Sequence, residues 1–148
     1  MKILLISDSH ERRININLEE FDLIIHAGDY GISRHYLEDN GIKYVAGNCD
    51  FSGPDYLEFL INEKKYYVVH GHQYRVKYDL LSLYLKAKEI NANIVIYGHT
   101  HQAYYEEKNG IIFINPGAYN YGEYAIIDDN IISFFRNGNK YKEINMIG

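Results

Sequence analysis

The 148-residue sequence has a single cysteine, Cys49, only two prolines and no tryptophan. One cysteine cannot form a disulfide within the chain, so a disulfide-stabilised fold is excluded. Long hydrophobic runs are also missing. The opening MKILLISDSH offers four apolar residues before polar chemistry begins, which is too short for a signal peptide core or a membrane span. We therefore expect a cytoplasmic protein with no membrane partner.

Basic residues are scarce as well. Lys and Arg number 15 against 20 Asp and Glu, which gives a formal net charge of -5. Binding to a nucleic acid backbone needs a basic surface, so nucleic acid is not expected as a stable partner. A small phosphorylated substrate held by a metal ion stays compatible with an acidic protein.

Short apolar runs with helix-sized segments between them fill the first two thirds of the chain. They predict five buried, mostly parallel strands at Ile3–Ile6, Leu23–Ile25, Tyr44–Ala46, Tyr66–Val69 and Ile94–Tyr97. The clearest helix is expected within residues 78–92, with Leu80, Leu81, Tyr84, Leu85, Lys88 and Ile90 mostly at helical spacing. Weaker helices are expected at Ile14–Glu20 and at Ser33–Asn40, where Ser33 could cap the helix.

The last third of the chain has a different pattern. Asn109-Gly110 and Asn137-Gly138 each stand between two strand-like runs, and Asn-Gly suits a type I′ turn, so we predict two hairpins. A chain that starts as α/β and ends antiparallel suggests two sheets packed face to face with helices outside. Its length fits a single domain over residues 1–148.

Each of the five apolar strands is followed by a polar cluster: SDSH, HAGD, GNCD, HGH and GHTH, in chain order. The carboxyl ends of strands form the ligand-binding crevice of α/β sheets, so these clusters should converge on one site. The gathered side chains are Asp8, His10, Asp29, Asn48, His70, His72, His99 and His101. Imidazole with carboxylate and amide oxygen suits borderline divalent cations, and the number of donors exceeds what one cation accepts. Two cations that share a bridging carboxylate are therefore expected.

Taken singly, each motif is weak evidence, because a lone histidine is usually a surface or core residue and Gly-Asp is a common turn. Together and in order, they resemble the calcineurin-like metallophosphoesterases, and within them the small bacterial and archaeal phosphodiesterases. The motifs are DSH at 8–10, GD at 28–29, GNCD at 47–50, HGH at 70–72, GHTH at 98–101 and NPG at 115–117.

The resemblance implies a four-layer αββα sandwich of two mixed sheets. It also implies one metal held by Asp8, His10, Asp29 and His101, and a second held by Asp29, Asn48, His70 and His99, with Asp29 bridging. Manganese is the first expectation for the two divalent ions, with nickel, zinc or iron as alternatives. The implied reaction is hydrolysis of a small phosphodiester by a hydroxide that bridges both ions.

Several residues near these motifs have open roles. The resemblance leaves His72 near the substrate rather than on a metal, although both histidines of HGH could reach one. His26 and Asp50 either orient the ligands or stabilise turns. His35 is expected at the surface. Cys49 stands where many relatives carry a histidine that helps the leaving group, and a thiol is a poorer proton donor.

Two features leave the function open. In NPGAYNYGEY, Ala118 replaces a serine that often follows NPG in the family, and the next arginine is Arg136, so a substrate contact is either absent or supplied by Tyr119, Asn120 or Tyr121. The alternatives to a phosphodiesterase are a protein-binding scaffold that resembles the retromer subunit of this fold, and a phosphomonoesterase. All seven expected ligands are present, which favours an enzyme. A homodimer is also compatible with the exposed tyrosines and hairpin edges.

Overall fold

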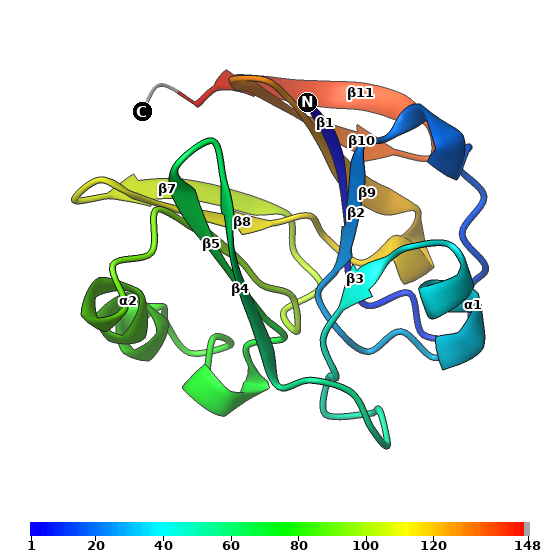
Figure 1. The fold of residues 1–148 in the computed structure, drawn as a ribbon, viewed down its shortest axis with the longest axis horizontal. Helices are drawn as coiled ribbons and strands as arrows, with labels where there is room; N and C mark the ends of the chain where they lie inside the picture. Colours follow the sequence, from blue (N-terminus) through cyan, green and yellow to red (C-terminus); the bar gives the residue numbers. More distant parts are fainter. Residues whose placement is uncertain (147–148) are drawn as a thin grey trace.

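The computed structural model describes residues 1–146, which form two mixed β-sheets. The first sheet has the strand order β11-β10-β9-β1-β2-β3 (Figure 1). Its strands are β1 (Lys2–Ile6), β2 (Leu23–His26), β3 (Lys43–Tyr44), β9 (Glu123–Asp128), β10 (Ile131–Arg136) and β11 (Asn139–Asn145). β1, β2 and β3 are parallel, and β9 pairs antiparallel with β1.

The second sheet has the order β4-β5-β6-β8-β7. Its strands are β4 (Tyr56–Ile61), β5 (Lys64–Val69), β6 (Ile94–Ile96), β7 (Tyr104–Lys108) and β8 (Ile111–Asn115). β5, β6 and β8 are parallel, and the edge strands β4 and β7 are antiparallel to their neighbours. The predicted parallel strands therefore exist, but they are divided between two sheets.

The main core lies between the sheets. Along β1, Ile3 and Leu5 contribute to this inner core, whereas Leu4 and Ile6 belong to a second cluster on the outer face of the same sheet. Side chains alternate between the two faces of a strand, so an uninterrupted apolar run fits a strand covered on both sides. This is why residues 3–6 of β1 are all apolar.

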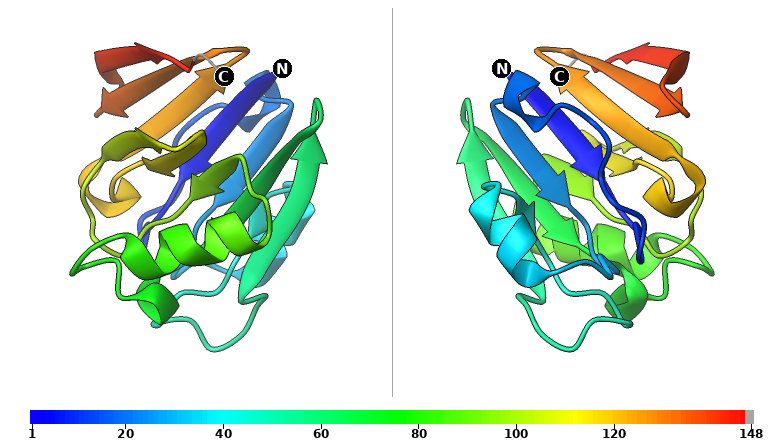
Figure 2. Two further views of the ribbon diagram at one scale, coloured as in Figure 1. Left: turned by 90° about the vertical axis from the view of Figure 1, so that its left-hand side faces the viewer. Right: turned by 90° about the vertical axis from the view of Figure 1, so that its right-hand side faces the viewer.

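One helix covers the outer face of each sheet (Figure 2). Leu37 of α1 (Arg34–Asp39) packs in the outer cluster of the first sheet, and Leu83 of α2 (Leu81–Glu89) packs in that of the second. The expected αββα layering is confirmed, with thin outer layers. Ser33 caps α1 by accepting a hydrogen bond from the backbone N–H of His35, as its position predicted.

The predicted helix at Ile14–Glu20 is wrong. Only a 3-10 turn, η1 (Leu18–Glu20), forms in this segment. Ile14, Ile16 and Leu18 are partly buried against the outer cluster at alternate positions, and this contact favours extended chain. Asn17 also works against a longer helix. Its side chain accepts a hydrogen bond from the backbone N–H of Glu19, so it caps only the last turn of this segment.

Two further expectations need correction. The buried face of α2 consists of Leu83, Tyr84 and Ala87, whereas Leu81 and Leu85 are exposed, so the face chosen from sequence was only partly right. The strand expected at Tyr44–Ala46 ends at Tyr44, although the two residues that follow are buried.

The two Asn-Gly hairpins are confirmed. Asn109 and Gly110 have φ of 51° and 82°, and Asn137 and Gly138 have φ of 50° and 83°. Positive φ at both central positions is the requirement of a type I′ turn, which joins β7 to β8 and β10 to β11.

Candidate metal centre

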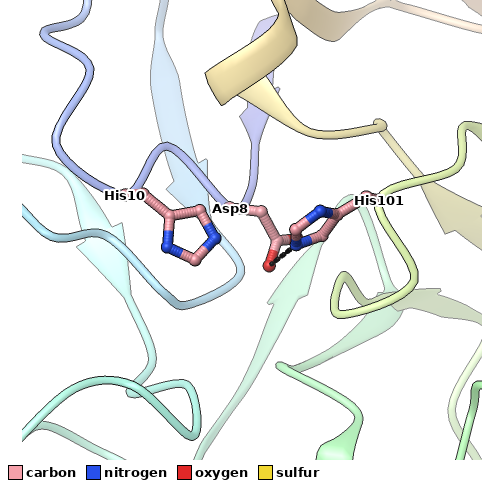
Figure 3. Close-up of side chains that lie close together, drawn as sticks. All are labelled: Asp8, His10 and His101. Carbon is pink, nitrogen blue, oxygen red and sulfur yellow. Dashed lines mark ion pairs between the residues drawn. The ribbon is translucent and has the colours of Figure 1, made fainter.

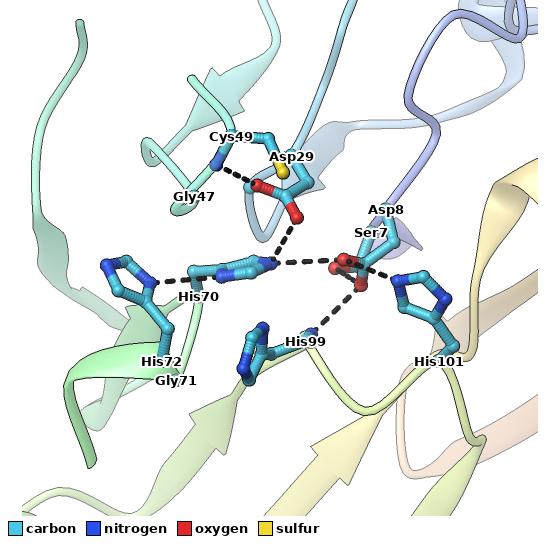
Figure 4. A network of polar contacts seen from close by, with 12 residues as sticks. Ser7, Asp8, Asp29, Gly47, Cys49, His70, Gly71, His72, His99 and His101 are labelled. Atoms are coloured by element: carbon cyan, nitrogen blue, oxygen red, sulfur yellow. Dashed lines mark hydrogen bonds and ion pairs between the residues drawn. The ribbon is translucent and has the colours of Figure 1, made fainter. Parts of the chain in front are cut away.

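Five of the predicted ligands gather where the parallel strands of the two sheets end, and Figure 4 shows them: Asp8, Asp29, His70, His99 and His101. Asp8 and His10 follow β1, Asp29 follows β2, His70 follows β5, and His99 and His101 follow β6. Backbone hydrogen bonds join loops within each sheet, from Asp8 N to the Gly28 carbonyl (2.9 Å) and from Gly98 N to the His70 carbonyl (3.0 Å). The crevice is thus formed by two facing sheet edges rather than by one open sheet.

Five of the predicted ligands have left-handed backbone. Their φ values lie between 50° and 70°, at Asp8, His10, Asp29, His99 and His101. Positive φ is uncommon for residues other than glycine and carries a steric cost, which the surrounding structure must offset. Backbone of this kind turns sharply after each strand and presents successive side chains to one point. The occurrence of left-handed backbone at five predicted ligands indicates a functional site.

Asp8 is the centre of the polar network and is fully buried. One carboxylate oxygen, Oδ2, accepts hydrogen bonds from Ser7 Oγ (2.6 Å) and from the backbone N–H of His99 (3.0 Å). The other oxygen, Oδ1, lies 3.0 Å from His70 Nε2 and 3.4 Å from His101 Nε2. Burial works to raise the pKa of Asp8, but the hydrogen bond and positive charge of His70 outweigh it, and the pKa is lowered.

Asp29 is the second carboxylate of the cluster. Its Oδ2 lies 3.3 Å from His70 Nε2, and its Oδ1 accepts the backbone N–H of Cys49 (2.9 Å). Burial works against ionisation here too, yet the hydrogen bonds from His70 and Cys49 lower the pKa of Asp29. Asp50 holds this arrangement, since its Oδ2 accepts from the backbone N–H groups of Asp29 (2.8 Å) and Gly47 (2.7 Å).

His70 carries a proton that the two carboxylates hold. Burial favours the neutral imidazole, but hydrogen bonds to Asp29 and Asp8 raise the pKa of His70 to about 9. Its other nitrogen, Nδ1, lies 3.1 Å from Nδ1 of His72. A nitrogen that carries a proton cannot ligate a metal, so binding of a cation by His70 would require loss of this proton.

His10 provides the clearest test of whether these residues fit a metal. Its Nε2 is buried and has no hydrogen-bond partner among residues 1–146, and it alone has this property among the side-chain nitrogen and oxygen atoms of that range. Burying a polar atom without a partner costs about 1–3 kcal/mol. The ring lies beside Asp8 and His101 (Figure 3), and the ligand atoms of these three residues lie within 4.8 Å of one another. A cation at this point would satisfy the atom, so the residues fit a metal.

Two more groups of ligand atoms meet the same 4.8 Å distance: Asp8, Asp29 and His70, and His10, Asp29 and Cys49. The carboxylates therefore link the His10–His101 side of the cluster to the His70 side. Asp8 and Asp29 each contact His70, and the bridging role expected of Asp29 stays a prediction.

The remaining predicted residues lie around this cluster. The His99 ring packs edge-on against His70 (ring centroids 4.9 Å apart), and burial together with the charges of His70 and Lys77 lowers the pKa of His99 to about 4. His72 is half-buried against both histidines, and burial and His70 also lower its pKa. Neither ring belongs to the three-ligand groups above.

The residues of the GNCD loop contact the centre partly through backbone N–H groups and partly through a side chain. Asn48 is exposed, and its assignment as a ligand stays a prediction. Cys49 is also exposed, but its Sγ lies among ligand atoms of His10 and Asp29. Burial and the neighbouring Asp29 carboxylate raise the pKa of the Cys49 thiol, which disfavours the thiolate that a nucleophile requires.

His26 is fully buried beneath the cluster. Its Nδ1 accepts the backbone N–H of Gly28 (3.2 Å), which leaves the proton on Nε2 for the 2.8 Å contact with Ser9 Oγ. Ser9 in turn donates to the Tyr30 carbonyl (2.6 Å). Burial lowers the pKa of His26 to about 4, so it is neutral. Together with the Asp50 contacts, this supports a role in orienting the ligand loops.

Two supporting residues were missed in the sequence. Ser7 orients Asp8, and Asn115 donates through Nδ2 to the Gly98 carbonyl (3.2 Å) and to Thr100 Oγ1 (3.0 Å), which fixes the GHTH loop. Ser7 directly precedes the DSH motif and Asn115 is the first residue of the NPG motif, so their position in the sequence was the available signal. Gly117 forms the turn expected at NPG, with φ of 87°.

Two facing sheets with this cluster at the carboxyl ends of their parallel strands define a metallophosphoesterase, and sequence comparison agrees. The model of the calcineurin-like phosphoesterase superfamily domain matches residues 1–127, and the chain belongs to this superfamily. It is 36% identical over 126 residues to the probable metallophosphoesterase YsnB of Bacillus subtilis, covering 80% of this chain and 75% of that protein. Membership implies divalent metal ions, and the predicted family resemblance is confirmed.

Solved structures support the fold. A predicted phosphoesterase from Streptococcus pneumoniae superposes with a TM-score of 0.82 at 27% identity, covering 97% of both chains. Vps29 from Entamoeba histolytica, solved as a complex with zinc, superposes at 0.79 with 19% identity, covering 99% of this chain and 100% of that chain. At that identity the second likeness concerns the fold alone. In residues 1–146, no helix is long and apolar enough to cross a membrane.

Proposed function

We propose that this chain, as one domain over residues 1–148, is a phosphodiesterase that depends on two divalent metal ions. One metal is assigned to Asp8, His10, Asp29 and His101, and the other to Asp29, Asn48, His70 and His99. Manganese is the metal we expect, with nickel, zinc or iron as alternatives. When bound, two such ions activate water as a nucleophile and neutralise negative charge on the phosphoryl oxygens.

The buried Nε2 of His10 is the observation that carries the proposal. A histidine nitrogen in a polar cluster normally finds a hydrogen-bond partner, because an unpaired buried polar atom is destabilising. A ring nitrogen of His10 lies within 4.8 Å of ligand atoms of Asp8 and His101, and a ring nitrogen of His10 lies within the same distance of ligand atoms of Asp29 and Cys49. A cation is the partner that fits both its chemistry and its neighbours.

The chain's own residues prepare the centre for metal. Ser7 and the His99 backbone occupy Oδ2 of Asp8, which leaves Oδ1 facing the histidines. The Cys49 backbone similarly occupies Oδ1 of Asp29. Each carboxylate thus offers an oriented oxygen, as oriented ligands in metal sites require.

His70 links metal binding to proton release. Its pKa of about 9 means that the metal-free protein holds this proton near neutrality. A nitrogen that ligates a metal must be deprotonated, so loading the centre should release the proton to solvent. Asp8 and Asp29, which hold this proton in the metal-free protein, would then be available to bind the cation.

The leaving group has no histidine beside it in the GNCD motif. Cys49 stands at that place with a raised thiol pKa, so the thiol is a weak proton donor near neutrality. We infer that the enzyme acts best on diesters with good leaving groups, or that water supplies the final proton.

The test is an assay of purified protein, loaded with Mn, Ni, Zn or Mg, against bis(p-nitrophenyl) phosphate and p-nitrophenyl phosphate. The proposal predicts turnover of the diester with at least one of the first three metals, and slower turnover of the monoester. Faster turnover of the monoester supports a phosphomonoesterase instead. An absence of turnover with every metal, in protein shown to contain two ions, supports a scaffold.

A further inference from the structure

Cys49 lies in a tight turn that packs directly on Asp29. A backbone hydrogen bond from Asp50 N to the Gly47 carbonyl (3.2 Å) closes the turn. Gly47 permits the close approach, because a methyl group at this position would overlap Asp29. The Cys49 N–H donates to Oδ1 of Asp29 (2.9 Å). Oδ2 of Asp50 accepts from the backbone N–H of Asp29 (2.8 Å), so the turn and the Asp29 loop are held together.

His10 is joined to the same loop. Its backbone N–H donates to the Asp29 carbonyl (2.9 Å). A ring nitrogen of His10, a carboxylate oxygen of Asp29 and Sγ of Cys49 all lie within 4.8 Å of one another. Figure 4 shows the sulfur beside the Asp29 carboxylate. Thiolate, imidazole and carboxylate are all ligands of zinc in proteins, so these three side chains form a possible ligand set that includes sulfur.

The burial of the three side chains agrees with a shared ion. Asp29 is buried, His10 is partly buried and Cys49 is exposed, so the sulfur is the member of the group nearest to solvent. Nε2 of His10 is buried and has no hydrogen-bond partner within residues 1–146. This unpaired nitrogen is a second observation, independent of the cysteine, that points to a cation at the same place.

Metal binding changes the charge next to the sulfur. In the metal-free protein, burial and the Asp29 carboxylate raise the pKa of the Cys49 thiol. A cation placed between the carboxylate and the sulfur reverses this effect, because a thiol that coordinates a metal is deprotonated. The S–H bond breaks, the proton passes to solvent, and the electron pair left on sulfur binds the ion without any change of oxidation state.

We propose that Cys49 is a ligand, through Sγ, of the metal ion assigned to His10 and Asp29. The proposal rests on the proposed function for the presence of that ion, and it adds sulfur to a set of nitrogen and oxygen ligands. Thiolate is a soft ligand that favours zinc over manganese. The His10 side of the centre should therefore prefer zinc more strongly than the His70 side does.

The test adds cobalt(II) stepwise to metal-free protein and follows absorption in the near ultraviolet. A thiolate bound to cobalt gives a strong sulfur-to-metal charge-transfer band, which nitrogen and oxygen ligands do not give. Cys49 is the only cysteine of the chain, so the band has one possible source. We expect the band in wild-type protein and its loss in Cys49→Ser. Phe51→Ala is the matched control, because Phe51 is a fully exposed neighbour in the same loop, and it should keep the band.

An exposed thiol can also bind cobalt alone, and His10→Ala separates this case from a shared ion. If His10 and Cys49 hold the same ion, His10→Ala should lose the band although the cysteine remains. A band of equal strength in His10→Ala overturns the proposal.

Metal affinity gives a second readout. Groups that only orient ligands contribute about 10- to 100-fold to affinity, so loss of a ligand in Cys49→Ser should weaken zinc binding by at least about tenfold. Manganese binding should weaken less, because manganese gains less from sulfur. Equal weakening of both metals, or of neither, contradicts the proposal.

A measurement on wild-type protein avoids any loss of folding in the variants. Iodoacetamide should alkylate Cys49 in metal-free protein, and zinc should slow this reaction by about tenfold or more, since the thiolate pair is then bound to the ion. Unchanged alkylation together with no cobalt band overturns the proposal. The proposed function is judged separately: hydrolysis of bis(p-nitrophenyl) phosphate by protein with two bound ions supports it whether or not the band appears.

Discussion

Oδ1 of Asp8, which follows β1 in one sheet, lies 3.0 Å from Nε2 of His70, which follows β5 in the other. Both side chains are fully buried. This contact joins the carboxyl ends of two separate parallel sets of strands. The metal centre that we propose therefore depends on the packing of the two sheets, and each sheet supplies only part of it.

Loss of single ligands should abolish activity. Asp29→Ala removes the carboxylate assigned to both metals, and His99→Ala removes an imidazole that packs against His70. We expect either variant to lose metal-dependent hydrolysis of bis(p-nitrophenyl) phosphate and to keep the far-ultraviolet circular dichroism of the wild type. Asp39→Ala, an exposed change on α1, is the control and should retain turnover. Turnover close to wild type in either ligand variant is incompatible with the two-metal assignment.

Cys49→His tests the leaving-group inference. An imidazolium donates a proton more readily than a thiol whose pKa is raised, so the variant should help esters with poor leaving groups most. The measurement is kcat/KM for a series of aryl diesters with different leaving-group pKa values. A smaller dependence of rate on leaving-group pKa is expected in the variant. If good and poor leaving groups respond equally, the inference fails.

Gly98→Ala should damage the centre without touching a ligand side chain. A methyl group at this position would overlap Ser7 Oγ and lie 2.6 Å from Asp8 Oδ2. Asp8 must then move, and we expect metal affinity to fall by about tenfold or more, as for other groups that orient ligands. Calorimetric titration with Mn measures the change. Gly110→Ala is the control for loss of stability alone: it strains a turn that needs positive φ, but no atom lies within 4 Å of the added methyl group, so metal affinity should be kept. Unchanged metal affinity in both variants contradicts the prediction.

His26 should make the metal-free protein sensitive to acid. Its pKa is about 4 in the folded protein, below the ordinary value of 6.5, so the unfolded chain takes up the proton first. Neutral His26 contributes to the free energy of unfolding above pH 6.5. As the pH falls toward 4, this contribution is lost and the free energy of unfolding decreases by roughly 2–3 kcal/mol. Urea unfolding at several pH values measures it. His26→Gln cannot take up the proton and should show a shallower loss, and an equal loss in both proteins would refute the assignment.

Much of the centre was predictable because polar residues directly follow short apolar runs. Such runs form strands covered on both faces, and their ends fix where Asp8, Asp29 and His70 lie. The Asn-Gly turns were equally informative, since both positions need positive φ. Local chemistry of this kind needs no knowledge of distant contacts.

The predictions that failed concern segments whose structure depends on tertiary packing. No strand was predicted over β4, whose side chains alternate between exposed and partly buried positions at a sheet edge. The helix expected at Ile14–Glu20 is replaced by extended chain, because alternate apolar residues pack on the outer cluster. Likewise, the role of Asn115 depends on contact with a loop that precedes it by 15 residues or more.

The central claim is that two metal ions are needed at this cluster. The most direct test adds Mn stepwise to metal-free protein and follows hydrolysis of bis(p-nitrophenyl) phosphate together with the number of bound ions. We predict that activity rises until two ions are bound per chain and that Asp29→Ala neither binds both nor gains activity. Full activity at one bound ion per chain, or no activity with two, would contradict the account.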